Sequence, residues 1–572
     1  MEYEVRYHEW LTNPYFDEAT KAELVALKGN DKEIRERFFR DLEFGTGGLR
    51  GILGAGVNRM NIYTVRRATQ GLANYIKKQG GEKKGVAIAY DSRRMSPEFA
   101  LDTALCLAAN KIKAYLFESL RPTPELSFAV RELGCIAGIV ITASHNPPDY
   151  NGYKVYWEDG AQITSPKDIE IIQEVNSITD FSEAKTTLKE EALAQGLLVI
   201  AGKEVDDKYI AELKKLVINP VSDESKSINI VYTPLHGTGN LPARRILSEL
   251  GFEHVYVVPE QELPDSEFST VGYPNPEDPK VFTLAKKLAG EVGADLILAT
   301  DPDADRLGIQ VRNEEGEFVL FNGNMTGALI AEYEFSQKAE KGILPANAAL
   351  IKTIVTGNIS DRIAEHYHAK LIEVLTGFKY IGEQIKYFEE SGSNEFIFGY
   401  EESYGYLIGT HSRDKDAIAA VMALCEAAAY YKSKGITLYE QMKRIYEKYG
   451  YYKEDLVSVT LKGIEGIEKI KAIMEGYRRN PPKRAGDYRI LKIRDYREDT
   501  ITELQTGAIT PTGLPKSDVL YFELEDDAWC AIRPSGTEPK IKFYFGVKGK
   551  NAEDAAARLQ KLMKDEVFRI KE

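Results

Sequence analysis

The segment Gly138–Lys154 reads GIVITASHNPPDYNGYK. Its first six residues form a run typical of a buried strand, and a polar loop punctuated by proline and glycine follows. Ser144 stands at the junction, with Lys154 ten residues further on. A hydroxyl exposed on a rigid base is what a nucleophile or phosphoryl carrier requires. The pattern equally fits a turn serine that bonds its own backbone, so the segment alone leaves two interpretations open.

Short apolar runs of this kind recur along the chain and alternate with helical patterns. The expected strands form three series: Gly85–Tyr90, Lys113–Phe117 and Gly138–Ala143; Ile228–Tyr232, His254–Pro259 and Asp295–Ala299; Leu350–Ile354, Lys370–Leu375 and Glu395–Gly399. The expected helices are Leu101–Asn110, Glu125–Leu133, Pro242–Leu250 and Asp416–Lys432, with a charged helical stretch over Ser165–Lys214. This alternation predicts α/β domains with parallel or mixed sheets.

Near Tyr452 the pattern changes, because strands begin to outnumber helices. The expected strands there are Leu456–Leu461, Arg489–Arg494, Val519–Leu524, Trp529–Ile532 and Ile541–Val547. We therefore expect an α/β protein with three similar mixed-sheet domains, at residues 1–204, 205–312 and 313–451, and a C-terminal α+β domain at 452–572. The 572 residues fit this division, since single cores stop growing at about 250–300 residues.

The chain carries 74 Lys and Arg against 88 Asp and Glu, a formal charge of −14. This balance disfavours nucleic acid or an anionic membrane as a partner, so an anionic ligand has to be held by local Arg and Lys. The sequence has no signal-peptide pattern and no apolar run of about 18 residues. The four cysteines lie in apolar contexts without CxxC spacing: Cys106, Cys135, Cys425 and Cys530. Buried reduced thiols and a cytoplasmic location are expected.

A second motif, DLILATDPDADR over Asp295–Arg306, leads a buried strand into Asp301, Asp303 and Asp305. Three carboxylates in one loop repel each other unless a cation compensates, and hard divalent cations prefer oxygen ligands. An EF-hand is excluded, because Arg306 stands at its sixth position and Arg312 at its twelfth. Room for a phosphate oxygen as a further ligand favours Mg²⁺. The alternative is a solvated acidic turn.

Two segments have the composition of anion sites. Arg533–Lys540, RPSGTEPK, gathers Arg, Ser, Thr and Lys between two strands and suits a dianionic phosphate, although a β-turn with capping hydroxyls is the alternative. Gly45–Gly51, GTGGLRG, is a Gly-rich loop that carries Arg50, and an ordinary flexible turn explains it as well.

Two more segments leave strands with polar groups. Gly399–Tyr406, GYEESYGY, combines carboxylates, a hydroxyl and aromatic rings, which suits a polyol such as a sugar, with a solvated acidic loop as the alternative. Thr376–Lys379 places a lysine at a strand end, whereas His236 has the setting of a structural loop histidine. Ligands of α/β domains bind beyond the carboxyl ends of strands, so the economical arrangement is one central cleft among the four domains.

These motifs occur in the order seen in the α-D-phosphohexomutase superfamily. The motifs that carry the resemblance are Thr142–Pro147, Asp301–Arg306, Gly399–Ser403 and Arg533–Thr537. The chain resembles the long phosphoglucomutase/phosphomannomutase branch, which includes phosphopentomutase-like enzymes and glucose-1,6-bisphosphate synthases. The resemblance covers nearly the whole chain and implies three similar α/β domains and a fourth domain around a central cleft.

The resemblance also implies roles for individual residues. Ser144 is the expected phosphoserine, and Asp301, Asp303 and Asp305 are expected to hold Mg²⁺ together with an oxygen of that serine. Glu401 and Ser403 are expected to bind sugar hydroxyls. The phosphate that is not transferred is expected at Arg533, Ser535, Gly536 and Thr537. The expected positively charged or proton-handling positions are Arg50, His145, Lys154, Arg306 and Lys379.

The implied reaction interconverts glucose 1-phosphate and glucose 6-phosphate through glucose 1,6-bisphosphate, which turns around in the cleft. In the bacterial phosphomannomutase/phosphoglucomutase type, the sugar-binding loop carries a histidine two residues after its serine. This chain has Gly405 there, which argues against mannose as the sugar of the substrate. Phosphopentomutase, glucose-1,6-bisphosphate synthase and metal-dependent phosphatase activities are the alternatives, and a non-catalytic sugar-phosphate sensor is disfavoured. The expected partners are small sugar phosphates, and the sequence leaves monomer or homodimer open.

Overall fold

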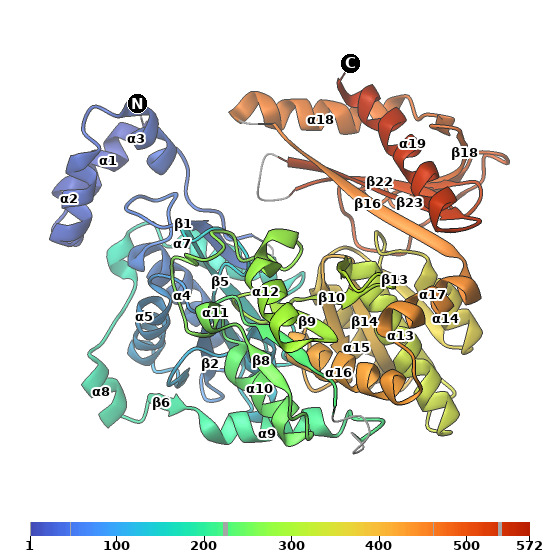
Figure 1. Cartoon of the computed structure of the whole chain (residues 1–572). Helices are drawn as coiled ribbons and strands as arrows, with labels where there is room; N and C mark the ends of the chain where they lie inside the picture. Colours follow the sequence, from blue (N-terminus) through green and yellow to red (C-terminus); the bar gives the residue numbers. More distant parts are fainter. Residues whose placement is uncertain (1, 46, 221–226, 462, 536–539, 572) are drawn as a thin grey trace. The chain divides into compact units, whose positions relative to one another are not determined.

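The computed structural model describes residues 2–45, 47–220, 227–461, 463–535 and 540–571 (Figure 1). The chain forms two compact units. The first contains residues 1–321, 381–391 and 403–435, and the second contains residues 322–380, 392–402 and 436–572.

The first unit opens with three helices, α1 (Glu2–Thr12), α2 (Glu18–Ala26) and α3 (Asp31–Phe38). Trp10 stacks on Phe16, with ring centroids 4.1 Å apart, and meets the ring of Phe38 edge-on. These rings pack on Tyr63 of the following helix and form a core of their own. Aromatic burial therefore attaches this helical segment to the first α/β domain.

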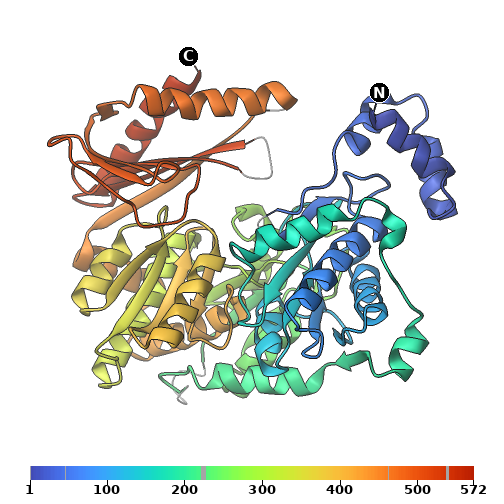
Figure 2. The ribbon, with the colours of Figure 1, turned by 180° about the vertical axis from the view of Figure 1, so that it is seen from behind.

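The first sheet is mixed and has the order β1-β5-β4-β2-β3-β6. Its strands are β1 (Gly48–Ile52), β2 (Val86–Tyr90), β3 (Ala114–Phe117), β4 (Ala137–Ile141), β5 (Tyr150–Trp157) and β6 (Leu198–Ala201). Its helices are α4 (Ile62–Lys78), α5 (Ser96–Ala109), α6 (Thr123–Glu132), α7 (Lys167–Ser177), the 3₁₀ turn η1 (Phe181–Glu183), α8 (Lys189–Ala194) and α9 (Lys203–Lys214). Leu72, Phe99 and Ile171 from α4, α5 and α7 share one core with the sheet, and α4 and α5 are the blue helices in front of it in Figure 2.

The second sheet has the order β11-β10-β9-β7-β8. Its strands are β7 (Ile230–Thr233), β8 (Val255–Val257), β9 (Leu296–Thr300), β10 (Leu307–Arg312) and β11 (Phe318–Phe321). The helical elements of this region are α10 (Asn240–Glu249), α11 (Pro259–Glu262), η2 (Pro279–Phe282) and α12 (Thr283–Val292). The first unit also contains β15 (Gly405–Ile408) and α16 (Ala417–Ser433).

In the second unit, β12 (Ala348–Thr353) pairs in parallel with β13 (Lys370–Val374) and β14 (Glu395–Glu401). The helices of this region are α13 (Gly323–Glu340), α14 (Ile359–His366) and α17 (Leu438–Tyr449), whereas most of α15 (Phe378–Ser391) belongs to the first unit. The order β13-β12-β14 repeats the orders β3-β2-β4 and β8-β7-β9 of the first two sheets, with every pair parallel. The three α/β domains therefore share one topology, and corresponding loops follow β4, β9 and β14.

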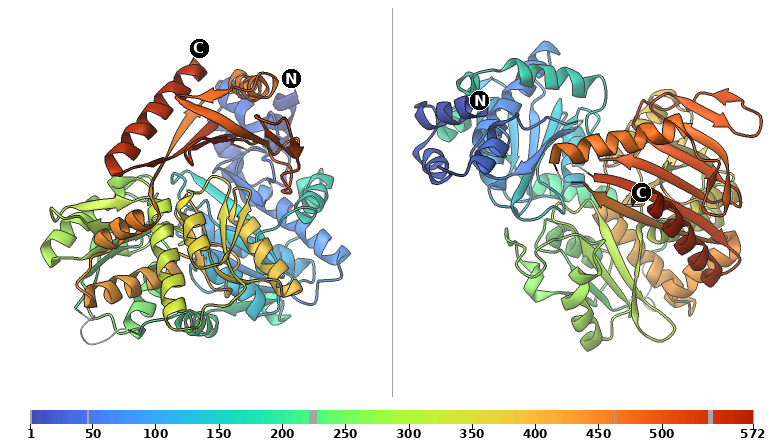
Figure 3. Two further views of the ribbon diagram at one scale, coloured as in Figure 1. Left: turned by 90° about the vertical axis from the view of Figure 1, so that its right-hand side faces the viewer. Right: turned by 90° about the horizontal axis from the view of Figure 1, so that it is seen from above.

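The C-terminal sheet is antiparallel, with the order β16-β23-β22-β21-β18-β19-β20. Its strands are β16 (Tyr451–Thr460), β17 (Arg484–Ala485), β18 (Tyr488–Asp495), β19 (Thr500–Glu503), β20 (Ile509–Thr510), β21 (Leu520–Leu524), β22 (Trp529–Pro534) and β23 (Lys540–Gly549). The helices α18 (Gly463–Arg479) and α19 (Ala552–Lys571) lie on one face of it (Figure 3), where Met474 and Leu562 pack on Phe543. This is the expected α+β domain.

The fold class is confirmed, and two local expectations are wrong. The stretch 165–214 is not wholly helical, because Leu198–Ala201 form β6, which pairs in parallel with β3. Gly48–Gly51 are not a loop, because they belong to β1, where Arg50 stands opposite Gly152 of β5. The four cysteines are buried and form no disulfide, as expected. Among the described residues, no helix combines the length and the apolar character needed to span a bilayer.

Candidate active site

Ser144 lies in the loop between β4 and β5 and is buried, with 3% of its surface exposed. Its φ angle is +52°, in the left-handed region that residues with a side chain seldom adopt. Its backbone N–H donates to the hydroxyl of Thr142 over 2.8 Å. Such a backbone persists only where surrounding contacts hold it, which is typical of functional sites.

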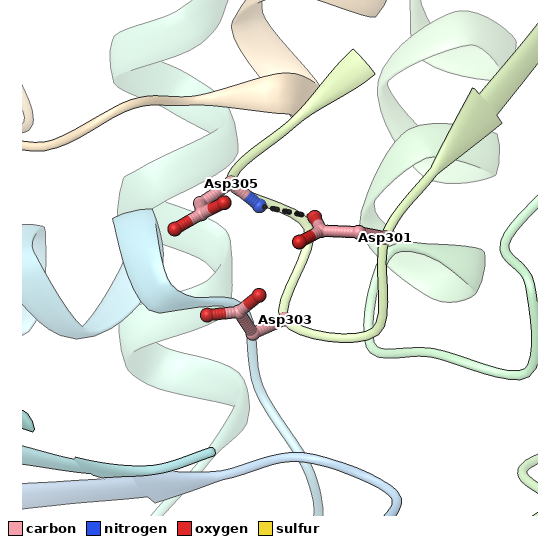
Figure 4. Close-up of side chains that lie close together, drawn as sticks. All are labelled: Asp301, Asp303 and Asp305. Atoms are coloured by element: carbon pink, nitrogen blue, oxygen red, sulfur yellow. Dashed lines mark hydrogen bonds between the residues drawn. The ribbon is translucent and has the colours of Figure 1, made fainter. Parts of the chain in front are cut away.

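The three aspartates follow β9 on one tight turn and are fully buried. One oxygen from each carboxylate lies within 4.8 Å of the others. Figure 4 shows the three side chains together and the bond from the N–H of Asp305 to Oδ1 of Asp301, 3.1 Å long. The neighbouring Ala304 has a φ of +51°, so this turn also contains a left-handed residue that is not glycine.

The serine loop and the aspartate loop meet. Oγ of Ser144 donates a hydrogen bond of 2.7 Å to Oδ2 of Asp301, and both groups are buried. Both loops belong to the first unit, and each leaves the carboxyl end of a strand in its own sheet. The structure therefore brings together the two most specific sequence motifs in one site.

The aspartate cluster fits a divalent cation. Oδ1 of Asp303 and Oδ1 of Asp305 are buried and have no hydrogen-bond partner among the described residues. Burial raises the pKa of Asp301 well above its ordinary value, and the neighbouring carboxylates of Asp303 and Asp305 raise it further. Buried carboxylate oxygens that accept no hydrogen bond and lie at this spacing are suitable ligands for a hard cation.

Two lysines partly neutralise the cluster. Nζ of Lys154 lies 2.8 Å from Oδ2 of Asp303 and 3.2 Å from Oδ2 of Asp305. Nζ of Lys415 lies 3.1 Å from Oδ2 of Asp305. Burial alone would raise the pKa of Asp305, but the ammonium groups of Lys415 and Lys154 lower it. These contacts keep Asp305 ionised and place two cations where a phosphoryl group would meet the carboxylates.

Three more expected residues surround this centre. Nδ1 of His145 lies 3.1 Å from Oγ of Ser144, and burial, with the cations of Arg306 and Arg50, holds the pKa of His145 well below its ordinary value. Arg306 pairs with Glu277 over 2.7 Å. Arg50 is exposed and donates to the side chain of Asn146 over 3.4 Å. The imidazole is therefore neutral, in the electrostatic field of two cationic side chains.

Sequence reasoning missed two residues of this centre. The hydroxyl of Thr123, at the start of α6, donates to Oδ2 of Asp303 over 2.8 Å. Lys415 lies in the loop before α16. This loop is hydrogen-bonded to β5, because the hydroxyl of Tyr156 donates to Oδ2 of Asp414 over 2.6 Å. Neither residue belongs to a recognisable motif. Thr123 precedes a proline and Lys415 lies between two aspartates, and both settings are too common to indicate a site. The expectation for His236 is confirmed, because both its ring nitrogens have structural partners, Leu263 and Thr270.

The remaining expected residues are divided between the units. Ser403 belongs to the first unit, on the turn before β15, and is partly buried. In the second unit, Oε1 of Glu401 accepts from the N–H of Gly377 over 2.8 Å, which joins the sugar-loop motif to the segment that carries Lys379. Gly536 and Thr537 lie outside the described residues.

The anion-binding motif predicted at Arg533–Lys540 begins at the end of β22. Burial, together with the carboxylate of Glu401, raises the pKa of Glu402, and the cations Lys542 and Arg533 oppose that rise. The N–H of Ser535 donates to the carbonyl of Lys540 over 2.8 Å. Within the second unit, Arg533 at the start of this anion-binding motif therefore acts electrostatically on Glu402 of the predicted sugar-binding loop.

Comparisons with known proteins agree with this architecture. Residues 41–181, 207–316 and 322–449 match the phosphoglucomutase/phosphomannomutase α/β/α domains I, II and III. A phosphoglucomutase of Staphylococcus epidermidis is 40% identical over 522 residues, covering 90% of this chain and 92% of the relative. A phosphoglucomutase of Staphylococcus aureus (strain MSSA476) is 37% identical over 535 residues, covering 93% and 94%.

Solved structures share the fold at lower identity. The parafusin phosphoglucomutase of Paramecium, in an open form, aligns with a TM-score of 0.65 at 18% identity, covering 92% of this chain and 95% of its own. A phosphoglucomutase/phosphomannomutase family protein from Burkholderia thailandensis aligns with a TM-score of 0.65 at 19% identity, covering 92% and 96%. These similarities concern the fold alone.

Relatedness of this extent places the chain among the isomerases that work as intramolecular phosphotransferases. Within that class, it belongs to the phosphoglucomutase/phosphomannomutase family of the α-D-phosphohexomutase superfamily, as its motifs indicated. The buried aspartate cluster is the metal-ion site that this family and this geometry suggest.

Proposed function

We propose that this protein interconverts glucose 1-phosphate and glucose 6-phosphate through a phosphoserine at Ser144 and glucose 1,6-bisphosphate. The observation that carries the proposal is the 2.7 Å hydrogen bond between Oγ of Ser144 and the buried aspartate cluster. It places the hydroxyl at a group of carboxylates that fits a cation, which phosphoryl transfer needs for charge neutralisation. The relatives at 37–40% identity are phosphoglucomutases, which supports glucose over a pentose or mannose.

In the proposed reaction, phospho-Ser144 gives its phosphoryl group to the free hydroxyl of the sugar phosphate. The bond from phosphorus to the serine oxygen breaks as the bond to the sugar oxygen forms, and the hydroxyl proton passes to a base. In the second half, the Ser144 oxygen takes the other phosphoryl group of the bisphosphate, the bond from that phosphorus to the sugar oxygen breaks, and the sugar oxygen takes up the proton. Mg²⁺ held by Asp301, Asp303 and Asp305 would neutralise charge on the transferred group when bound.

The other residues act by position and charge. Lys154 and Arg306 border the aspartate cluster and suit the equatorial oxygens of the transferred group, and Arg50 stands beside Asn146 in the same unit. His145 is proposed as a further catalytic residue, because its neutral ring lies within hydrogen-bond distance of the Ser144 hydroxyl. Lys379 is proposed as a further charged or proton-handling group. We propose that Glu401 and Ser403 bind sugar hydroxyls. The phosphate that is not transferred is proposed to bind at Arg533, Ser535, Gly536 and Thr537.

The substrate is tested with a coupled assay on glucose, mannose, ribose and deoxyribose 1-phosphates at equal enzyme concentration. Glucose 1-phosphate is expected to give the highest kcat/KM. If it is the poorest of the four, the glucose assignment is wrong. The buried cysteines, which form no disulfide, support the proposed cytoplasmic location.

The reaction class is tested by intact mass before and after incubation with glucose 1,6-bisphosphate and Mg²⁺. A gain of one phosphate that is absent in Ser144→Ala supports the phosphoserine. Ser144→Ala is also expected to lose turnover while it still binds Mg²⁺ and sugar phosphate. Normal turnover in this variant would exclude the scheme, and release of inorganic phosphate without isomerisation would indicate a phosphatase instead.

A further inference from the structure

The guanidinium group of Arg93 lies beneath the serine loop, and 1% of the residue's surface is exposed. One of its terminal nitrogens donates to the carbonyl oxygens of Ser144 and Asn146. The other donates to the carbonyls of Pro147 over 2.8 Å and Tyr150 over 3.2 Å. A single side chain therefore gathers four carbonyl groups of the loop that carries the nucleophile.

Asp91 holds both ends of this arrangement. Its Oδ2 lies 3.3 Å from Nε of Arg93 and accepts from the hydroxyl of Thr142 over 2.6 Å. That hydroxyl accepts the N–H of Ser144 over 2.8 Å. The left-handed backbone of Ser144 is thus held at its N–H through Thr142 and at its carbonyl through Arg93, and both partners rest on the same buried carboxylate.

The guanidinium group also packs on the ring of Phe268, a residue of the domain that contains the second sheet. The ring centroid of Phe268 lies 5.0 Å from the guanidinium carbon of Arg93, and Phe268 is fully buried. The surrounding segment also contacts the two active-site loops. Tyr273 meets the ring of His145 edge-on, with centroids 6.0 Å apart, and Glu277 pairs with Arg306 over 2.7 Å.

We propose that Arg93 is a positioning residue, which sets the Ser144 hydroxyl at the aspartate cluster by holding the carbonyls of the serine loop. The inference rests on the proposed phosphoserine role of Ser144. Arg93 contacts Ser144 at its backbone carbonyl, so it acts on the hydroxyl through the backbone. Stacking on Phe268 ties the serine loop to the domain that carries the aspartates.

The physical reason lies in the chemistry of guanidinium. Arginine presents five N–H donors in a rigid planar fork, whereas lysine presents three donors at one point on a flexible stem. A lysine keeps the charge beside Asp91 but cannot serve four carbonyls at once. Phosphoryl transfer depends on in-line positioning, and a misplacement of about 1 Å costs on the order of 100-fold in rate.

The experiment compares Arg93→Lys with Arg94→Lys. Arg94 is the adjacent residue, about half exposed, and its side chain pairs with Glu267 over 2.8 Å. Four quantities are measured in each variant: kcat, KM for glucose 1-phosphate, the rate at which glucose 1,6-bisphosphate phosphorylates Ser144, and the Kd of Mg²⁺. Arg93→Lys is expected to lower kcat and the phosphorylation rate on the order of 100-fold, with KM and the Kd of Mg²⁺ within about 3-fold of wild type. Arg94→Lys is expected to match wild type in all four.

An unchanged kcat in folded Arg93→Lys overturns the inference, and so does a loss shared equally by kcat, KM and the Kd of Mg²⁺. If Arg93→Lys does not fold, Phe268→Leu replaces it, because leucine keeps apolar contact but removes the ring face under the guanidinium. An unchanged kcat in Phe268→Leu then overturns the inference. Ser144→Ala is measured in parallel: full activity there rejects the phosphoserine, whereas inactive Ser144→Ala with fully active Arg93→Lys rejects only the role of Arg93.

Discussion

Thr123 holds Asp303 at two points, although 180 residues separate them in the chain. Its hydroxyl donates to Oδ2 over 2.8 Å, and its N–H donates to the backbone carbonyl over 2.9 Å. Thr123 is the first residue of α6, a helix of the serine domain, whereas Asp303 belongs to the aspartate loop of the next domain. The first domain thus orients an aspartate of the second, the kind of outer contact that tunes a metal ligand.

Thr123→Val is expected to weaken Mg²⁺ binding by roughly 10-fold, because valine keeps the shape but leaves Oδ2 of Asp303 without this donor. Isothermal titration calorimetry on the purified variant measures the Kd directly. Thr123→Ser keeps the hydroxyl and serves as the control, with a Kd close to wild type. Equal affinities in the valine and serine variants would contradict the role given to the hydroxyl.

Mg²⁺ is expected to raise the unfolding temperature of the protein, because the ion compensates three buried carboxylates that repel each other. At a hundred times the Kd, ligand binding stabilises the folded state by about 2.7 kcal/mol. Differential scanning calorimetry with Mg²⁺ or with EDTA at matched ionic strength measures the shift. Asp303→Asn is expected to lose most of it, and a shift of wild-type size in that variant would place the ion elsewhere.

Gly405→Ala is expected to lower kcat/KM between roughly 10- and 100-fold, the equivalent of one charge-assisted hydrogen bond. A Cβ at this position would stand 2.1 Å from Cδ of Lys415, so the lysine would have to leave Asp305. Steady-state kinetics with glucose 1-phosphate measures the loss. Gly290→Ala is the control, because a Cβ there meets no atom within 4 Å. Wild-type kinetics in Gly405→Ala would show that the contact of Lys415 is dispensable.

Glu454→Gln is expected to remove part of the pH dependence of stability. Burial raises the pKa of Glu454 to about 7 against the opposing cation of Lys352, and its Oε1 has no hydrogen-bond partner among the described residues. Between pH 4.5 and about 7, the Glu454 carboxyl is therefore protonated in the folded state and ionised in the unfolded chain, where its pKa has the ordinary value of 4.5. This contribution is complete below pH 4.5 and is lost as pH rises through 7.

Melting temperatures at pH 5 and pH 8 check this expectation. Glu454→Gln should match wild type near pH 5 and exceed it at pH 8. The exposed Glu447→Gln on α17 is the control, with the wild-type difference between the two pH values. A wild-type pH dependence in Glu454→Gln would mean that another group titrates.

The sequence predicted central strands of the sheets and missed both edge strands of the first sheet. The strands β4 and β9 are continuous apolar runs between turn signals, so their burial could be read from composition. β6 has four residues between charged helices, and β1 is an edge strand rich in glycine. Pairing with a neighbouring strand makes both of them strands, and no local pattern records that pairing.

The candidate site likewise contains residues that the local sequence predicts and residues that it does not. Ser144 and the aspartates were predictable, because each motif concentrates its chemistry within a few residues of a strand end. Thr123 and Lys415 were not, since each is an isolated polar residue whose partner comes from another part of the chain. Arg93 was not predictable either, because its proposed function depends on four backbone carbonyl groups, which every residue has and which no sequence pattern marks.

Local residue order by itself determined the class of this protein: which strands are buried, which loops carry a hydroxyl, carboxylates or cations, and which family these loops match. Only the tertiary structure decided that the Ser144 hydroxyl bonds Asp301, that Lys415 reaches Asp305, and that Arg93 and Thr123 support the two loops. The reason is physical. Hydrophobic periodicity is a property of neighbouring residues, whereas distances between loops arise only when separate sheets have packed.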